Sequence, residues 1–307
     1  MWRYKKLQKR LLHRIYSQLY RDAERTTQNG ILVAGTARSG TTWLGSLIAS
    51  QVPCRMMFEP FHPGKIVEFR RFHYFQYMRP TEPNSELQAY CHRVFSGNIR
   101  HRWIDREVEH LRPHYRLIKE IRANLFLRWI SLTFPEIALL FIIRHPCAVV
   151  ASRLQLKWAT DTDLEPFLAQ PQLVEDFLQD KLVVIQQAKT AAEKHAIIWC
   201  ISNLVPLKQF GPKGLNVIFY ENLVLQPEIE IPKLFQAINL PYKDTIFSQI
   251  EKPSTTTLRS SAVVTGDNKI THWQNELSPT QIRDILAIVA AFGLDDLYSE
   301  AAGPLKH

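Results

Sequence analysis

The chain has 307 residues, of which 46% are hydrophobic and 22% charged, and this composition excludes disordered, collagen-like and low-complexity proteins. Lysine and arginine outnumber aspartate and glutamate by 38 to 29, which gives a formal charge of +9 and favours an anionic partner. Nucleic acid is not expected as that partner, because no helix-turn-helix, zinc-finger or RNA-binding motif accompanies the charge.

The apolar runs and the cysteines indicate a cytoplasmic location. The longest uninterrupted apolar run, residues 137–143, is far shorter than the stretch of about 20 that spans a membrane. Charges are scattered through the first residues, where a signal peptide has an apolar block. The four cysteines are far apart and form no CxxC pair, so neither a disulfide framework nor a zinc site is expected.

Residues 1–29 are predicted to contain a basic amphipathic helix. Leu7, Leu11, Ile15 and Leu19 recur at four-residue spacing, and seven lysines or arginines precede the first acidic residue. Two interpretations stay open. The helix either packs on the domain surface with solvated charges, or makes peripheral contact with a membrane or a partner.

Residues 30–300 are predicted to form one α/β domain. Short apolar runs at residues 30–34, 115–119, 139–143 and 215–220 alternate with helical sequence. Such alternation requires crossover connections between the strands and therefore predicts a parallel sheet. The expected fold class is a single P-loop-like α/β domain, with a central parallel sheet flanked by helices.

An irregular insertion is predicted at residues 53–113. The segment is rich in arginine and aromatic residues and lacks a clean period. It is expected to bind the acceptor, although an ordinary surface segment has the same composition. Five aromatic residues are open to two interpretations, as stacking surfaces for rings or as core residues: Phe69, Phe72, Tyr74, Phe75 and Tyr77.

Two further helical segments are predicted. Residues 172–205 contain no proline or glycine and indicate one long helix or two. Near the C-terminus, Ser278 and Gln281 form a capping-box pattern around Pro279, which suits the first helical position. Gly293 is expected to end this last helix.

The segment 35–42, GTARSGTT, is predicted to bind phosphate. It follows a predicted strand and opens a helix that ends before Pro53, so free backbone N–H groups and the helix dipole meet there. Its two glycines have P-loop spacing, but Thr41 and Thr42 stand where a nucleotide triphosphatase has Lys followed by Ser or Thr. The principal cation of this loop is instead Arg38.

A second strand end carries a matching pair of polar residues. Arg144 ends an apolar run, Pro146 suits the start of the next helix, and Ser152 lies about 9 Å further along that helix. We expect Arg144 and Ser152 to converge on one more phosphate beside the first loop, at a crevice of the sheet. His145 is expected to cap the helix or to line the crevice.

Over roughly residues 30–160, the chain resembles the sulfotransferases that use 3'-phosphoadenosine 5'-phosphosulfate (PAPS). The sequence RSGTTWL at residues 38–44 is similar to the (K/R)SGTTWL motif of that family, and Arg144 followed by Pro146 and Ser152 is similar to RxPxxxxxS. The resemblance implies that Arg144 and Ser152 bind the 3'-phosphate of PAPS. It also implies a set of residues that binds the 5' end: Ala37, Arg38, Ser39, Gly40, Thr41, Thr42 and Trp43.

Within the family, the chain looks most like the carbohydrate-type or prokaryotic branch. Arg38 replaces the lysine of the phenol and steroid branch, and MFEPFH at residues 57–62 is similar to an FEP segment of the carbohydrate enzymes. The C-terminal signature RKGxxGxWK is not present. Residues 252–254 and 266–273 are only faintly similar to the loop that covers the nucleotide.

Sulfuryl transfer needs a cation on the leaving oxygen and a base for the acceptor's proton. Arg38 is the predicted cation, and Lys119 either assists it or is an ordinary lysine at the sheet edge. Glu59 is the first candidate for the base, because an apolar setting between Phe58 and Pro60 would raise its pKa, and His62 is the second.

The sequence therefore predicts an enzyme that transfers a sulfuryl group from PAPS to a hydroxyl acceptor, with a carbohydrate or glycolipid as the favoured acceptor. This chemistry needs no metal. One alternative is a P-loop nucleotide kinase with a degenerate Walker A motif. Another is a non-catalytic module that binds anionic glycans or a membrane surface. The sequence does not predict the oligomeric state.

Overall fold

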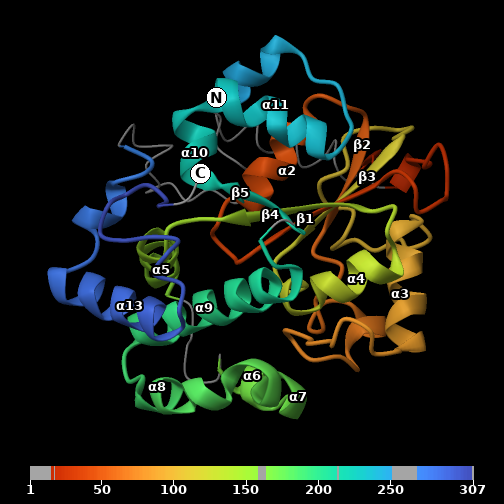
Figure 1. The fold of residues 1–307 in the computed structure, drawn as a ribbon. Helices are drawn as coiled ribbons and strands as arrows, with labels where there is room; N and C mark the ends of the chain where they lie inside the picture. Colours follow the sequence, from red (N-terminus) through yellow and green to blue (C-terminus); the bar gives the residue numbers. More distant parts are fainter. Residues whose placement is uncertain (1–14, 17, 158–163, 213, 251–267, 306–307) are drawn as a thin grey trace.

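The computed structural model describes residues 15–16, 18–157, 164–212, 214–250 and 268–305. Within them, five parallel strands form a central sheet that is covered by helices on both faces (Figure 1). This arrangement confirms the predicted fold class.

The sheet and its helices alternate along the chain as expected for crossover connections. The strands are β1 (Gly30–Gly35), β2 (Cys54–Phe58), β3 (Tyr115–Glu120), β4 (Ala138–Ile143) and β5 (Asn216–Phe219). The described α-helices are α2 (Thr41–Ala49), α3 (Ser85–Phe95), α4 (Leu127–Thr133), α5 (Pro146–Gln155), α6 (Glu165–Leu168), α7 (Pro171–Leu173), α8 (Leu182–Gln187), α9 (Ala191–Phe210), α10 (Tyr220–Leu225), α11 (Pro227–Ala237) and α13 (Pro279–Ala291).

Strand β1 lies in the middle of the sheet, whose order is β2-β3-β1-β4-β5. The chain builds the β2–β3 side first and then crosses to the β4–β5 side, so the direction of winding changes next to β1. Because all strands are parallel, their carboxyl ends meet at one edge of the sheet. Ligands of such sheets bind at this edge, in the crevice where the strand order reverses.

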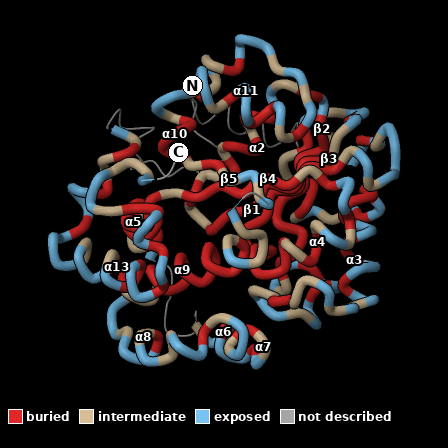
Figure 2. The backbone as a smooth tube through the Cα atoms, in the orientation of Figure 1, coloured by how far each residue is buried: buried red, intermediate tan, exposed pale blue. Residues whose placement is uncertain are grey.

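The sheet is covered on both faces, which explains why the central strands β1 and β4 read as continuous apolar runs. Ile31 and Val33 of β1 pack into a core with α2 and α11. Leu32 and Ala34 point to the other face and join a larger core with α5, α9 and α13. Figure 2 shows β1 to β4 as mostly buried and the outer surfaces of the helices as largely exposed, whereas β5 is buried only at Ile218.

The prediction that residues 53–113 are irregular is wrong in two places. They begin with β2, which pairs with β3, and they contain α3, whose first turn is capped by the side chain of Asn84. The charge of Arg55 interrupts the apolar pattern of β2, and this hid the strand in the sequence. The rest of the segment consists of turns and a short 3₁₀ helix.

The helical predictions further along the chain hold with changes in extent. Residues 172–205 are split before α9, where Thr190 and Glu193 form a capping box, and the part before this split consists of short helical pieces. Helix α9 then continues through Pro206. The last predicted helix is confirmed as α13, and both hydrogen bonds of its capping box are present.

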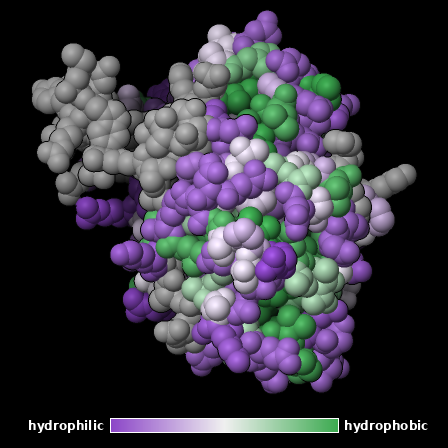
Figure 3. Space-filling model, turned by 90° about the vertical axis from the view of Figure 1, so that its left-hand side faces the viewer, coloured by the Kyte–Doolittle hydropathy of each residue, from purple (hydrophilic) through white to green (hydrophobic). Residues whose placement is uncertain are grey.

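Only part of the predicted N-terminal helix lies among the described residues. Ile15 and Leu19 lie in helical turns with exposed side chains, whereas Leu7 and Leu11 lie outside the described residues, as do residues 252–254 and Gly266. No helix in the described part of the chain is long and apolar enough to cross a membrane. Figure 3 shows one face of the molecule, where hydrophilic residues surround smaller groups of hydrophobic ones.

Candidate active site

The predicted phosphate-binding loop lies between β1 and α2, at the carboxyl edge of the sheet. Gly40 precedes the helix with a φ of 100° and, as a glycine, has no side chain to cap the N–H groups of the first turn. A Cβ on Gly40 would lie 2.9 Å from the ring of Tyr220, so both the conformation and the close contact require glycine. The loop thus presents open backbone donors at a helix N-terminus, which suits an anion.

The structure brings the two predicted motifs together. The Nε of Arg38 donates a hydrogen bond of 2.9 Å to the hydroxyl of Ser152, although the two residues are 114 positions apart. Arg144 donates a longer hydrogen bond of 3.4 Å to the carbonyl of Arg38. One ligand can therefore contact the loop of β1 and the helix that follows β4.

The electrostatics at this meeting point favour an anion. Burial, together with the neighbouring Arg144, lowers the pKa of Arg38 to about 10. A lowered pKa of an arginine means that its surroundings disfavour the positively charged form. A bound anion would stabilise that form. The buried Ser39 hydroxyl and the Nε of Arg144 have no hydrogen-bond partner among the described residues, so a bound ligand can satisfy both.

Neighbouring side chains form hydrogen bonds with the phosphate loop and with the start of α5. Arg153 donates a hydrogen bond to the hydroxyl of Thr36, at the start of the phosphate loop. Trp199 of α9 donates to the carbonyl of Arg144. His145 caps α5 by accepting from the N–H of Cys147, which confirms the predicted cap.

Glu59 lies at the carboxyl end of β2, on the opposite side of β1 from Arg144. Its backbone N–H donates to the carbonyl of Lys119, and its side chain forms ion pairs with Lys119 and, at 2.7 Å, with Arg122. All three side chains are buried. Glu59 has a φ of 45°, a strained conformation for a residue other than glycine, which often marks a functional position.

The prediction that an apolar setting raises the pKa of Glu59 is wrong. Burial alone would raise this pKa, but Lys119 and Arg122 outweigh burial and lower it to about 2. Glu59 is therefore ionised at neutral pH. The two cations come from β3 and from the turn that follows it. No feature of the sequence indicates that they lie beside Glu59.

Rings surround the second candidate base, His62. The rings of Tyr74 and Trp103 stand almost perpendicular to its imidazole, with centroids 5.3 Å and 5.5 Å away. Burial, and to a smaller extent the charge of Arg122, lower the pKa of His62 to about 4, so the imidazole is neutral at pH 7. Its Nδ1 accepts a hydrogen bond from the N–H of Gly64.

Sequence reasoning missed Arg122 and Trp103 as site residues. Arg122 binds Glu59 and also donates to the hydroxyl of Tyr74, and Trp103 donates from its indole to the carbonyl of Glu59. For Arg122, a position three residues beyond the end of a predicted strand was the available signal. Trp103 lies in an aperiodic segment and had no such signal.

The five candidate stacking aromatics divide by exposure. Phe69 and Tyr77 are buried in the core, whereas Phe72 and Phe75 are half-buried. Tyr74 is 37% exposed and lies over the guanidinium of Arg122. Only Tyr74 among the five therefore combines exposure with contact to the site.

A cavity of about 330 Å³ lies between α10, the start of α11 and the residues on either side of the undescribed segment 251–267. Its wall includes Ile250 and Lys269, and the carbonyls of these residues accept hydrogen bonds from the indole of Trp43 and from Arg144, respectively. The rest of the wall is partly apolar and partly polar: Val224, Leu225, Pro227, Glu228, Phe247, Asn268 and Ile270. Hydrogen bonds thus connect the cavity wall to Trp43 of α2 and to Arg144.

Comparisons with known proteins agree with these motifs. A family model described as "Sulfotransferase family" matches residues 30–244, which is more than half of the chain. None of the curated proteins matches the chain in sequence.

Several solved structures have a similar arrangement of the chain. The sulfotransferase domain from the Curacin biosynthetic pathway is 14% identical, with a TM-score of 0.46, covering 86% of this chain and 97% of that domain. Mouse sulfotransferase SULT7A1 complexed with PAP is 12% identical, with a TM-score of 0.43, covering 92% and 87%. Sulfotransferase STF9 from Mycobacterium avium is 10% identical, with a TM-score of 0.45, covering 90% and 79%.

Proposed function

Because the chain belongs to the sulfotransferase family, we propose that it transfers a sulfuryl group from PAPS to a hydroxyl oxygen, and that the acceptor is a carbohydrate or a glycolipid. The observation that carries the proposal is the hydrogen bond of 2.9 Å between Arg38 and Ser152. It joins the loop suited to the 5' end of the nucleotide to the helix suited to its 3'-phosphate.

The donor is assigned to the β1–α2 loop and the start of α5. The open N–H groups at the start of α2 and the side chain of Arg38 bind the 5'-phosphosulfate. Arg144 and Ser152 bind the 3'-phosphate, for which the unpartnered Nε of Arg144 supplies a charge-assisted hydrogen bond. The adenine is assigned to the cavity beside Trp43, whose wall is joined by hydrogen bonds to Trp43 and Arg144.

In the transfer, the acceptor oxygen forms a bond to sulfur while the bond from sulfur to the bridging phosphate oxygen breaks. By analogy with phosphoryl transfer, the protein contributes mainly positioning and stabilisation of charge. Arg38 lies in the loop that holds the bridging oxygen, so its guanidinium stabilises the negative charge that develops there. Lys119, at the end of β3, assists Arg38 in this role. In the structure, Lys119 forms an ion pair with Glu59.

Glu59 is the proposed base, with His62 as the second candidate. A carboxylate with a pKa near 2 is ionised and ready to accept a proton, but it holds that proton weakly while Lys119 and Arg122 are bound to it. If Lys119 turns toward the negative charge on the donor, Glu59 loses one of its two cations and its pKa rises. Proton uptake by Glu59 and charge stabilisation by Lys119 would then support each other.

Labelled transfer tests the proposal directly. The purified chain is incubated with PAPS carrying ³⁵S and with a panel of neutral glycans, glycolipids and phenols, and each product is scored for label. Label on a glycan or glycolipid is expected. Label on phenols alone would overturn the acceptor class, and label on no member would count against a hydroxyl acceptor of these types.

Thermal unfolding separates the proposal from its alternatives. Adenosine 3',5'-bisphosphate should raise the unfolding temperature without magnesium, because ligands that bind the folded state stabilise it. Stabilisation by ATP that depends on magnesium would favour a kinase instead. Stabilisation by neither nucleotide would favour a non-catalytic binding module.

A further inference from the structure

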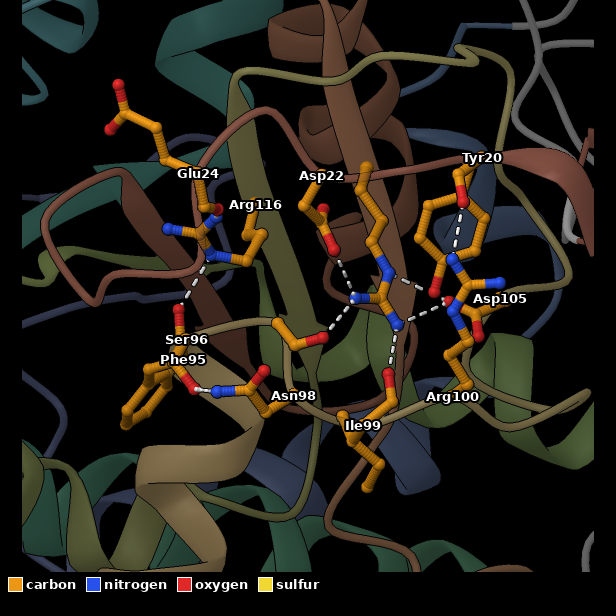
Figure 4. Close-up of polar contacts among 12 residues, drawn as sticks. Tyr20, Asp22, Glu24, Phe95, Ser96, Asn98, Ile99, Arg100, Asp105 and Arg116 are labelled. Atoms are coloured by element: carbon orange, nitrogen blue, oxygen red, sulfur yellow. Dashed lines mark hydrogen bonds and ion pairs between the residues drawn. The ribbon is translucent and has the colours of Figure 1, made fainter.

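A buried arginine of β2, Arg55, connects three segments that are far apart in the sequence. Figure 4 shows the polar contacts of this region, which we call the Arg55 cluster. The cluster joins the segment before β1, the turn after α3 and the turn at residues 101–106. Its members are Tyr20, Asp22, Arg55, Gly97, Ile99, Arg100 and Asp105.

All five N–H groups of Arg55 have a partner. Nε and Nη2 contact Oδ1 of Asp105 at 2.9 and 2.8 Å, and Nη1 donates to the carboxylate of Asp22 and to the carbonyl of Gly97, each at 3.0 Å. The remaining N–H, on Nη2, donates to the carbonyl of Ile99. A fully buried guanidinium with two carboxylate partners is saturated, so it offers no site for a ligand and instead fixes the segments that it binds.

The turn at residues 101–106 connects the cluster to Glu59 and His62. The second carboxylate oxygen of Asp105 accepts from the N–H of His101, and the ring of His101 accepts from the N–H of Trp103. Trp103 then donates from its indole to the carbonyl of Glu59 and packs edge-on against His62. The same turn also binds the end of β2, because the carbonyl of Ile104 accepts a hydrogen bond from the N–H of Phe58.

We infer that Arg55 is a positioning residue for the acceptor side of the site: through Asp105 it holds Trp103 against Glu59 and His62, and through Asp22 it ties this arrangement to the segment before β1. The assignment of this side to the acceptor rests on the proposed function, whereas the coupling between the segments rests on the observed contacts alone. Arg55 touches no reacting group itself. Its effect reaches the site only through the turn that carries Trp103.

Arg116 provides a matched control within the same cluster of segments. It is the register partner of Arg55 on β3 and is equally buried. It donates to the carbonyls of Phe95, Glu24 and Thr26, and none of these contacts reaches the turn at residues 101–106. Replacing either arginine by lysine keeps the charge and removes the fork of donors. The two variants therefore differ mainly in which segments they release.

Hydrogen–deuterium exchange of the full chain distinguishes the two variants. In Arg55→Lys, exchange at residues 97–108 is expected to accelerate by about tenfold or more, because hydrogen bonds to that segment are lost. In Arg116→Lys, acceleration is expected near Phe95 and Thr26 but not at residues 101–106. Exchange in the phosphate loop should stay within about twofold of the original rate in both variants. Equal acceleration at residues 101–106 in both variants, or none in Arg55→Lys, would overturn the inference.

A second readout follows the side chain of Trp103 alone. The difference in fluorescence between the original protein and Trp103→Phe reports this indole, and the same difference is taken in the Arg55→Lys and Arg116→Lys backgrounds. A red shift of the Trp103 signal is expected with Arg55→Lys and not with Arg116→Lys. An unshifted signal with Arg55→Lys would contradict a role for Arg55 in holding Trp103.

The milder variant Asp22→Asn covers the case in which Arg55→Lys does not fold. It keeps an oxygen for Arg55 but removes the charge, and it should produce the same two changes at smaller amplitude. Unchanged exchange at residues 101–106 in this variant would remove the segment before β1 from the inference. Both measurements work without nucleotide or acceptor, so they can succeed or fail independently of the proposed function.

Discussion

The two parts of the site to which we assign the donor and the acceptor lie on opposite sides of β1 and use their cations differently. On the donor side, the hydrogen bonds of Arg144 go to the carbonyl groups of Arg38 and Lys269. On the acceptor side, Lys119 and Arg122 are both bound to one carboxylate, Glu59. Neutral partners leave a cation's charge to act on a ligand, whereas a carboxylate partner cancels part of it.

Similar numbers of basic residues therefore have different roles at the two ends of one crevice. The donor side is prepared for an incoming anion. The acceptor side uses its cations to keep one carboxylate ionised in a buried place, where burial alone would favour the protonated form. Five measurements test this contrast, and they follow in order of decreasing effect.

Removal of the donor-side cation should have the largest effect. Arg38→Met is expected to lower turnover by about 10³-fold, in the range found when a donor to the transition-state charge is removed. Steady-state transfer of label from PAPS measures it. Arg128→Met, on α4, is the control and should leave turnover unchanged. A loss for Arg38→Met of less than about tenfold would mean that another cation meets the leaving oxygen.

The ion pairs of Glu59 should make stability depend on acid pH. The pKa of Glu59 is lowered from 4.5 to about 2, so its contribution is present above about pH 4.5 and is lost as the pH falls toward 2. Urea unfolding should show Glu59→Gln destabilised at pH 7 by an amount on the order of 3 kcal/mol. This difference should shrink markedly at pH 3.

The exposed ion pair of Glu86 with Arg71 gives the control for the acid experiment. Both side chains are about 60% exposed, so Glu86→Gln should change stability little at either pH. A difference for Glu59→Gln that stays constant between pH 7 and pH 3 would contradict the lowered pKa.

The same Glu59→Gln variant tests the acceptor side as the source of the base. Turnover is expected to fall by about 10²-fold, as for loss of a general base. The affinity for adenosine 3',5'-bisphosphate should change by less than about twofold, because the donor is bound on the other side of β1. Isothermal titration measures the affinity. Equal turnover in the variant would remove Glu59 from the mechanism and leave His62 as the candidate.

Arg144→Ala should weaken nucleotide binding selectively. Loss of a charge-assisted contact is expected to reduce the affinity for adenosine 3',5'-bisphosphate by about 30-fold. The affinity for AMP, which lacks the 3'-phosphate, serves as the internal control and should fall much less. An equal loss for both nucleotides would show that Arg144 supports the loop through the carbonyls of Arg38 and Lys269 instead.

Ser152→Ala should have the smallest of these effects. It removes a neutral hydroxyl that now accepts from Arg38, so affinity for the bisphosphate should fall by about fivefold. Ser131→Ala, a helix serine that donates to the carbonyl of Arg128, is the matched control and should have no effect. A larger loss for Ser152→Ala than for Arg144→Ala would reverse the proposed ranking of the two contacts.

The donor side could be predicted from sequence because its motifs are local. Each consists of a strand, a turn and the first residues of a helix within a short stretch of chain, and each keeps its own geometry. The position of Gly40 and the caps of α5 and α13 follow from the same local rules and are confirmed. The capping pattern of Thr190 and Glu193 was equally readable and marks the split before α9.

On the acceptor side, the sequence predicted Glu59 and His62 but not the partners of Glu59, because these partners are distant in sequence. Glu59 meets Lys119 and Arg122 at separations of 60 and 63 residues. Strand β2 was missed for a related reason. Its second residue, Arg55, is buried only because Asp22 and Asp105, 33 and 50 positions away, neutralise it. A single sequence does not reveal such partners, so a buried charge reads as a surface residue.

The hydrogen bonds between the sheet and the segment before β1 have a practical consequence for protein engineering. Arg55 uses the carboxylate of Asp22, and Arg116 uses the carbonyls of Glu24 and Thr26. A truncated version that starts at the first strand would leave two buried guanidinium groups short of acceptors and should be hard to express. A version shortened at the N-terminus for crystallisation should therefore keep Tyr20 and all residues after it.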